Sequence, residues 1–205
     1  MRIATGWSGG VLRGGPEWAR MAPVVKCGGS LLSLPAWPSR LGDCHAALAA
    51  AGPPLVVVGG GAIVDGLRRI DAAGGLDPGL VHDQAIALMR ITGHLVATAL
   101  GLPVTASPGG GGVLDAAAFV AAEHVACPRG WEVTSDSIAA LAARFAGRPL
   151  VLLKSCPPPV VEGDALEAAS AAGWVDDWFS EAATGIEWIG WACPEPTEPS
   201  ATALH

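Results

Sequence analysis

The scarcity of lysine draws attention to two residues whose charge is suited to chemistry. The chain contains ten arginines and two lysines, Lys26 and Lys154, and each lysine ends an apolar run that predicts a buried strand. An ammonium group on a flexible stem follows a moving phosphoryl group as a point charge, whereas a planar guanidinium suits a fixed bidentate partner. The two lysines therefore indicate phosphoryl transfer. The competing interpretation is that both side chains simply extend from strand ends into solvent.

Two glycine runs follow two of the predicted strands. They comprise Gly28, Gly29 and Ser30 in the first run and Gly59, Gly60 and Gly61 in the second. Glycine lets backbone N–H groups approach anionic oxygens closely, and a helix that follows adds its positive N-terminus. Two such loops side by side predict a site that holds two phosphates in line, although either run alone is also typical of a tight turn.

A candidate partner for the lysines lies at the start of a predicted helix over residues 135–146. Asp136 follows two hydroxyl residues, Thr134 and Ser135. Capping of this helix needs only one such side chain, and Ser135 or Asp136 would supply it. The functional interpretation is that Asp136 holds a lysine ammonium group in place, while the hydroxyl groups of Thr134 and Ser135 contact ligands.

Two charged residues follow the second glycine run on the same predicted helix. Asp65 and Arg68 are three residues apart, a spacing that allows an ion pair on the helix surface. Alternatively, Arg68 reaches an anionic group of the molecule that accepts the phosphoryl group. The sequence leaves both interpretations open.

Apolar strands alternate with helices along most of the chain. Strands are predicted at residues 23–26, 55–58, 102–106, 150–154 and 186–192, and helices at 39–51, 63–70, 82–100, 135–146 and 164–172. Strands that are apolar throughout are typical of a mostly parallel sheet covered on both faces, so an α/β three-layer sandwich is predicted. Ligands bind at the carboxyl ends of such strands, where the lysines and glycine runs lie. The glycine-rich loop at 108–112 is predicted to be flexible and without chemistry.

The domain boundaries follow from composition. Residues 21–193 are predicted to form one domain, preceded by a disordered extension over residues 1–20 that carries no chemistry and followed by a loose acidic tail over residues 194–205. Four tryptophans in the last third of the chain are expected to pack in the core rather than stack on a ligand ring: Trp174, Trp178, Trp188 and Trp191.

Composition also limits the partners. The chain has 205 residues, 51% of them hydrophobic, and a formal net charge of −7, which excludes disorder for most of its length and makes nucleic acid an unlikely partner. Two long windows without charged residues, 44–64 and 91–114, are interrupted by prolines and glycines. No membrane span is therefore predicted, and a cytoplasmic protein is expected. The five scattered cysteines predict reduced thiols, and no metal site is predicted because His124 and Cys127 lack a second matching pair. A homodimer or larger homo-oligomer is expected.

Three segments, residues 26–30, 56–65 and 134–136, resemble motifs of the amino acid kinase superfamily in the same order. The first two are similar to its phosphate loops, and the third to the segment whose aspartate orients the catalytic lysine. The resemblance extends over residues 23–192 and implies the amino acid kinase fold. It also implies catalytic roles: Lys26 would stabilise charge on the migrating group, Asp136 would position Lys26, and Lys154 would contact the nucleotide phosphates.

The resemblance further implies two sets of binding residues. Phosphate and nucleotide groups are expected at Gly28, Gly29, Ser30, Ser135 and Ser155. The acceptor is expected at Gly59, Gly60, Gly61, Asp65, Arg68 and Thr134. The implied cofactors are ATP and Mg²⁺, with Mg²⁺ arriving on the ATP and bound by phosphate oxygens and water.

Within the superfamily, residues 131–140 and 150–155 are most similar to the short branch of [5-(aminomethyl)furan-3-yl]methyl phosphate kinases. This likeness implies transfer of the γ-phosphoryl group of MgATP to a small phosphomonoester, which becomes a diphosphate, in methanofuran-type cofactor biosynthesis and one-carbon metabolism. A phosphate acceptor is already ionised and needs no general base, which agrees with the lack of a convincing one in the sequence.

Two other classes of function stay open. One is a kinase of the same fold with a different acceptor, such as isopentenyl phosphate, UMP or acetylglutamate. The other is a non-catalytic member that binds nucleotide or oxyanions. Residues 155–159, Ser-Cys-Pro-Pro-Pro, replace an aspartate and glycine pattern of larger members and favour the second class, whereas Lys26 and Asp136 favour an enzyme.

Overall fold

The computed structural model describes residues 2–15, 20–122, 126–160 and 164–195. Within these ranges, eight strands form one sheet in the order β1-β2-β8-β7-β3-β4-β6-β5. The strands are β1 (Arg2–Ala4), β2 (Trp7–Arg13), β3 (Val24–Cys27), β4 (Leu55–Val58), β5 (Val104–Thr105), β6 (Gly112–Leu114), β7 (Leu150–Leu153) and β8 (Ile189–Pro194). The helices are α1 (Trp37–Leu48), α2 (Gly61–Gly74), α3 (Pro78–Leu100), α4 (Ala116–Ala122), α5 (Ser135–Ala146), α6 (Ala165–Ala171) and α7 (Phe179–Ala182), with 3-10 turns η2 (Gly29–Ser33) and η3 (Ala49–Ala51).

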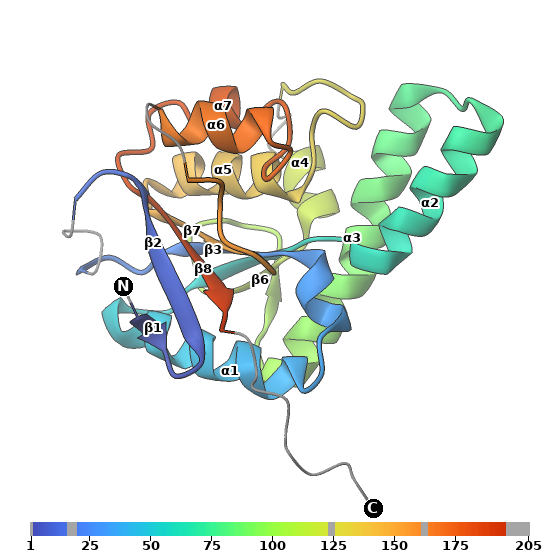
Figure 1. Cartoon of the computed structure of the whole chain (residues 1–205). Coiled ribbons are helices and arrows are strands. Elements are labelled where there is room, and N and C mark those ends of the chain that lie inside the picture. The colour runs from blue at the N-terminus through green and yellow to red at the C-terminus, as the bar shows by residue number, and fades with distance from the viewer. Residues whose placement is uncertain (1, 16–19, 123–125, 161–163, 196–205) are drawn as a thin grey trace, which may run out of the picture.

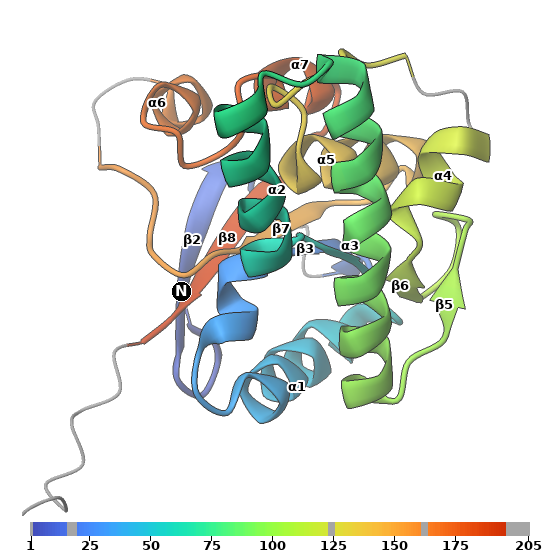
Figure 2. The ribbon, with the colours of Figure 1, turned by 90° about the vertical axis from the view of Figure 1, so that its right-hand side faces the viewer.

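The six strands from β8 to β5 run parallel, and β1 and β2 are antiparallel additions at one edge. The predicted α/β architecture with a mostly parallel sheet is therefore confirmed. Helices α5, α6 and α7 cover one face of the sheet and α1 covers the other (Figure 1). In the view of Figure 2, α2 and α3 stand in front of the ends of the strands. The carboxyl ends of β3, β4 and β7 consequently meet beneath these two helices.

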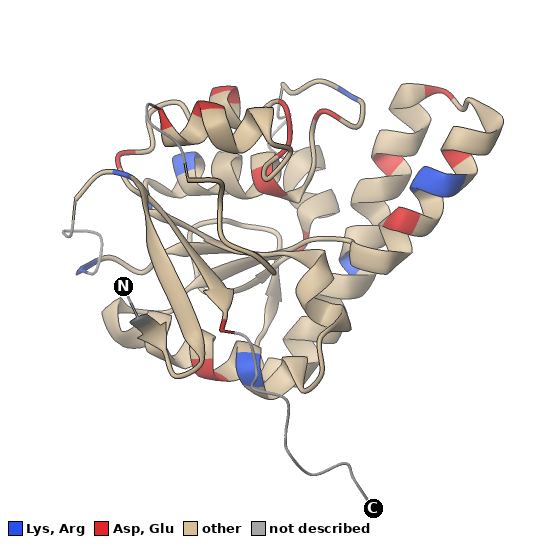
Figure 3. Ribbon diagram, viewed as in Figure 1, with Lys and Arg blue, Asp and Glu red and all other residues tan. Residues whose placement is uncertain are grey.

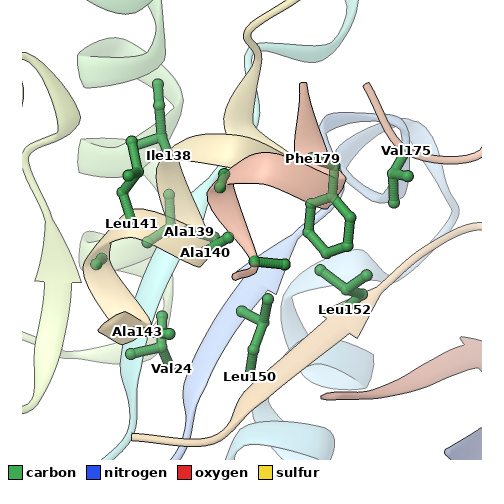
Figure 4. Close-up of a cluster of buried hydrophobic side chains, with 14 of the residues drawn as sticks. Val24, Ile138, Ala139, Ala140, Leu141, Ala143, Leu150, Leu152, Val175 and Phe179 are labelled. Atoms are coloured by element: carbon green, nitrogen blue, oxygen red, sulfur yellow. The ribbon is translucent and has the colours of Figure 1, made fainter. Parts of the chain in front are cut away.

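Successive side chains of the buried strands point to opposite faces of the sheet, which divides the core into two clusters. Val24, Leu150 and Leu152 pack against α5, as Figure 4 shows, together with Phe179. Their neighbours in sequence, such as Val25 and Val151, face the opposite way and pack with residues of α1 and α3. Successive side chains of a strand point to opposite faces, so a strand buried on both sides must be apolar at every position. The same rule decides which face each lysine occupies.

The amino-terminal residues correct the predicted domain boundary. Residues 2–13 form β1 and β2 rather than a disordered extension, and β2 pairs with β8 from Trp7 to Arg13. Trp7 is 2% exposed and its indole N–H donates to the backbone oxygen of Arg40. At the other end, Pro194 belongs to β8 and Glu195 donates its backbone N–H to Gly6, so these two residues are not part of a loose tail. Residues 1, 16–19 and 196–205 lie outside the described residues.

The glycine-rich loop predicted at 108–112 is one residue shorter in the structure. Its last residue, Gly112, opens β6, which lies between β4 and β5 in the sheet. Gly112 has a φ of +122°, and a Cβ there would lie 2.5 Å from the backbone oxygen of Pro103. Glycine is required at this position because other residues rarely adopt that φ and a side chain would collide with the neighbouring strand. Gly112 is thus part of the sheet, whereas residues 108–111 form the turn that leads into it.

Charge and hydropathy are distributed as in a folded domain. The basic residues drawn in Figure 3 are spread over several elements, among them α1 and α2. Over the residues that the structure describes, no helix is both long enough and apolar enough to cross a membrane. In the same residues, no group of three or more His, Cys, Asp or Glu side chains is arranged to hold a metal ion, and His124 lies outside them.

Candidate active site

Both lysines point to the same face of the sheet and meet one carboxylate. Lys26 is two residues after Val24 on β3 and therefore points to the same face of the sheet. Lys154 is likewise two residues after Leu152 of β7, so both lysines face α5. Asp136, the second residue of α5, lies between them. Its Oδ1 is 2.9 Å from Lys26 Nζ and its Oδ2 is 2.8 Å from Lys154 Nζ. The structure thus brings Asp136 to both lysines, not to Lys26 alone.

The three charged groups are largely removed from water. Lys26 is 4% exposed and Asp136 is 5% exposed. Burial lowers the pKa of Lys154 to about 8, and the nearby Lys26 ammonium adds to this effect while Asp136 opposes it. Burial alone would raise the pKa of Asp136, but Lys26 and then Lys154 together hold that pKa below its ordinary value. The carboxylate is therefore ionised and the site carries a net positive charge that suits an anionic ligand.

The two glycine runs touch each other at the ends of β3 and β4. A Cβ on Gly29 would lie 2.5 Å from the Cα of Gly61 and 2.9 Å from the backbone oxygen of Gly59. A Cβ on Gly59 would lie 2.8 Å from Ser135 Oγ, so the same close approach extends to the start of α5. Backbone N–H groups of two loops are thereby brought together without side chains between them, which is the arrangement that phosphate oxygens require.

Alanine at Gly29 is expected to disrupt this contact, because no adjustment of a flexible side chain makes room against backbone atoms. We expect Gly29→Ala to lower the free energy of unfolding by about 1–3 kcal/mol, as overpacking does, and to weaken MgATP binding. Urea unfolding and isothermal titration calorimetry measure both effects. The matched control is Gly66→Ala on α2, where a Cβ meets open space and a gain of up to about 1 kcal/mol is expected from helix propensity. Equal behaviour of the two variants would contradict the close-contact argument.

A pocket of about 220 Å³ opens between these loops, α2, α3 and α5. Most of the predicted site residues line it: Lys26, Gly29, Ser30, Gly59, Gly60, Gly61, Asp65, Arg68, Thr134, Ser135 and Asp136. Its remaining wall is mainly apolar and comes from Val64, Ala85, Ile86, Met89, Trp131, Val133 and Ile138. The pocket therefore combines a charged end at the sheet with an apolar wall under the helices.

Three predicted residues do not line this pocket: Gly28, Lys154 and Ser155. Gly28 extends the ladder of the sheet by donating its N–H to the backbone oxygen of Leu153. Ser155 lies beside the first glycine run, where Ser30 Oγ is 3.2 Å from Ser155 Oγ. The Lys154 ammonium contacts Asp136, which itself lines the pocket.

Arg68 is held by an aromatic ring. Its guanidinium carbon lies 4.1 Å from the centre of the Trp131 ring, and the Trp131 indole N–H donates to Asp71 Oδ2 at 2.7 Å. Arg68 and Asp71 are both on α2, so this helix contacts both the ring face and the N–H group of the indole. A guanidinium stacked in this way keeps its N–H donors free for a planar anionic partner. The sequence singled out Arg68 but gave no signal for the ring that orients it.

Two further residues near the lysines, Asp176 and Trp174, were not among the predicted site residues. Asp176 accepts hydrogen bonds from the backbone N–H and the hydroxyl of Thr134, both at the start of α5. The Thr134 hydroxyl is thus engaged with Asp176 rather than presented to a ligand, although the residue lines the pocket. Trp174 accepts a hydrogen bond from Lys154 Nζ on its backbone oxygen at 2.5 Å. Both residues are distant in sequence from their partners, so no local pattern reveals them.

Comparison with known proteins places the fold. No protein-family model and no curated protein matches the sequence. One solved structure that does match is the crystal structure of uridylate kinase from Archaeoglobus fulgidus, with a TM-score of 0.59 over 86% of this chain and 92% of that chain at 17% identity. The chain has the fold of uridylate kinase. The predicted amino acid kinase fold is therefore confirmed, and the lysine–aspartate–lysine group lies at the carboxyl ends of its parallel strands.

Proposed function

We propose that this protein is a kinase that transfers the γ-phosphoryl group of MgATP to a small phosphomonoester. The observation that carries the proposal is the pair of buried ammonium groups on Asp136, at the ends of adjacent parallel strands and beside two touching glycine loops. An acceptor phosphate oxygen attacks the γ-phosphorus, the bond from that phosphorus to the β,γ-bridging oxygen breaks, and ADP leaves. The acceptor becomes a diphosphate.

The lysines supply the electrostatic part of catalysis. Lys26 lines the pocket and neutralises charge on the migrating phosphoryl group, while Lys154, on the β7 side, neutralises the nucleotide phosphates. Asp136 keeps the two ammonium groups at a fixed separation in a site with little water, where such interactions act strongly. The glycine loops donate backbone N–H groups to both phosphate groups and hold them in line. No proton needs to leave the acceptor, so no general base is required.

The far side of the pocket selects the acceptor. Arg68 is oriented by Trp131 toward an anionic group, and the apolar wall of Ile86, Met89 and Val133 suits an uncharged body of small size. On the resemblance of residues 131–140 and 150–155, we propose [5-(aminomethyl)furan-3-yl]methyl phosphate as the acceptor. The two carboxylates that line the pocket are Asp65 and Asp136, and Asp136 is committed to the lysines. Mg²⁺ therefore enters as part of MgATP, bound by phosphate oxygens and water.

The test is release of ADP from MgATP in the presence of each acceptor separately. The furan phosphate is compared with isopentenyl phosphate, UMP and acetylglutamate at equal concentration. Turnover confined to the furan phosphate supports the full proposal, and turnover with another phosphate supports the reaction while discarding the acceptor. Binding of MgATP without ADP release from any acceptor contradicts the proposal and favours a nucleotide-binding protein.

The lowered pKa of Lys154 predicts a loss of MgATP affinity in mild alkali. Its ammonium form is the one that attracts phosphates, and with a pKa of about 8 it is lost as the pH rises through 8. Affinity is therefore expected to be highest below pH 8 and to fall between pH 8 and pH 9.5. Calorimetric titrations in buffers of different ionisation enthalpy measure this fall, and also the proton taken up on binding near pH 8. In Lys154→Met the affinity is expected to be weak and independent of pH over the same range.

A further inference from the structure

The start of α5 is held by a carboxylate from a distant loop. Asp176 Oδ2 accepts from the backbone N–H groups of Thr134 at 2.8 Å and Ser137 at 3.0 Å, and from the Thr134 hydroxyl at 2.7 Å. Asp176 Oδ1 accepts from the hydroxyl of Ser137. The local cap contributes little, since Thr134 Oγ1 is 3.5 Å from the N–H of Asp136. These contacts hold the residues on both sides of Ser135 and Asp136, and Asp136 is the residue that binds both lysines.

The same loop also holds Lys154 directly. The backbone oxygen of Trp174 accepts from Lys154 Nζ at 2.5 Å, and the centre of the indole ring lies 5.0 Å from that nitrogen. The indole N–H donates to the backbone oxygen of Cys156 at 3.0 Å, which fixes the ring against the segment that follows Lys154. Trp174 therefore contacts Lys154 itself, and Asp176 contacts Thr134 and Ser137, which flank Asp136 in the first turn of α5.

We propose that residues 174–176 position the phosphoryl-transfer machinery, with Asp176 aligning Asp136 through the first turn of α5 and Trp174 aligning Lys154. The inference rests on the proposed function for its catalytic meaning. Asp176 is a positioning residue: it acts through Asp136 and touches no reacting group. A charged lysine held by a carboxylate, a carbonyl and an indole face has little freedom, and loss of any of these contacts changes where the ammonium lies.

Burial of Asp176 beside Asp136 costs free energy, and a role as a helix cap alone does not explain why the residue is placed there. Burial and the nearby charge of Asp136 raise the pKa of Asp176, so two carboxylates are kept close together at one helix terminus. An ordinary cap avoids this cost, as α6 shows, where its own Asp164 accepts from the N–H groups of Leu166 and Glu167. A distant carboxylate beside Asp136 is explained by the need to set the position of that residue.

The experiment compares two capping carboxylates, Asp176→Asn and Asp164→Asn. Asp164 caps a helix that carries no site residue, so Asp164→Asn controls for the loss of charge from a capping carboxylate. The first readout is steady-state kinetics of ADP release with MgATP and the acceptor that turns over. The second is NMR of protein labelled with [13Cε]lysine, which contains only the signals of Lys26 and Lys154 and therefore reports the titration of each ammonium group without any substrate. Lys154→Met assigns the two signals.

Asp176→Asn is expected to lower kcat by about 10–100-fold, as loss of a supporting partner commonly does, with little change in KM for the acceptor. The Lys154 titration midpoint is expected to move below its parent value near 8, because Asp136, whose negative charge raises the Lys154 pKa, is no longer held firmly against the ammonium. Asp164→Asn is expected to leave kcat and the midpoint unchanged. An Asp176→Asn protein that loses stability while keeping the parent kcat and Lys154 midpoint would overturn the inference.

A milder variant covers the case in which Asp176→Asn does not fold. Ser137→Ala removes one of the donors to Asp176 without touching the pocket, and the same changes are expected in smaller measure. Parent-like kcat and midpoint in Ser137→Ala then count against the inference. If the parent protein releases no ADP with any acceptor, the proposed function has failed, and the NMR titration alone decides whether residues 174–176 set the state of Lys154.

Discussion

Lys26→Met is expected to slow phosphoryl transfer by about 10³-fold or more, the size of effect seen when a preorganised electrostatic group is removed from a reaction site. Methionine keeps the length and apolar stem of lysine but has no charge to offer the migrating group. Asp136 still pairs with Lys154 at 2.8 Å, so the buried carboxylate keeps a partner and the domain is expected to fold. Initial rates of ADP release at saturating MgATP, with circular dichroism to check the fold, measure the effect.

Arg90→Met is the matched control for this change. Arg90 pairs with Asp115 at 2.9 Å on the surface of α3, and its side chain is 50% exposed. The Arg90→Met variant loses one positive charge, as Lys26→Met does, but at a position outside the pocket. Its rate of ADP release is therefore expected to stay within twofold of the parent. A Lys26→Met protein that folds and turns over like Arg90→Met would refute the proposed mechanism.

Trp7→Ala is expected to lower the free energy of unfolding by about 3–5 kcal/mol, the usual cost of truncating a large buried aromatic side chain. Trp7 is 2% exposed and packs with Leu31, Leu41 and residues of the cluster between the sheet and α1. Its loss leaves a cavity and removes the hydrogen bond from the indole to Arg40. Deletion of β1 and β2 is expected to be more damaging still, because β8 then loses its antiparallel partner. Urea unfolding followed by tryptophan fluorescence and circular dichroism measures both.

Val11→Ala provides the comparison on the same strand. Val11 is 45% exposed, so its truncation is expected to change the free energy of unfolding by no more than about 0.5 kcal/mol. Similar urea-unfolding midpoints for the Trp7 and Val11 variants would show that β2 contributes little to the stability of the fold. That result is the one expected if residues 1–20 were a disordered extension.

The amino-terminal strands show why some elements escape sequence analysis. Residues 7–13, Trp-Ser-Gly-Gly-Val-Leu-Arg, contain two glycines, which local propensity disfavours in strands. In the structure these glycines make room for other groups: a Cβ on Gly10 would lie 2.7 Å from Trp191 Nε1. A residue almost 200 positions away thus explains the composition, and only the folded chain brings it there. The strand is a product of tertiary packing, which local patterns do not contain.

The candidate site was predictable in its parts and not in its assembly. Strand alternation and strand-end position are local properties, so the sequence pointed to Lys26, Lys154 and the two glycine runs from periodicity and composition alone. Asp136 was identified from its helix start as a partner for one lysine. The packing of α5 across the sheet places Asp136 between both lysines. It also places the Thr134 hydroxyl against Asp176. Such geometry arises from long-range contacts.

By itself, the amino-acid sequence determined that this chain forms an α/β sandwich and that its candidate functional residues lie at strand ends, because hydrophobic periodicity and glycine conformational freedom act over a few residues. The tertiary structure decided the rest. It recruited the amino-terminal strands, stacked Arg68 on Trp131 and brought residues 174–176 to the buried lysine–aspartate–lysine group. These contacts join residues tens to nearly two hundred positions apart, and their free energy comes from burial that exists only once the whole domain has formed.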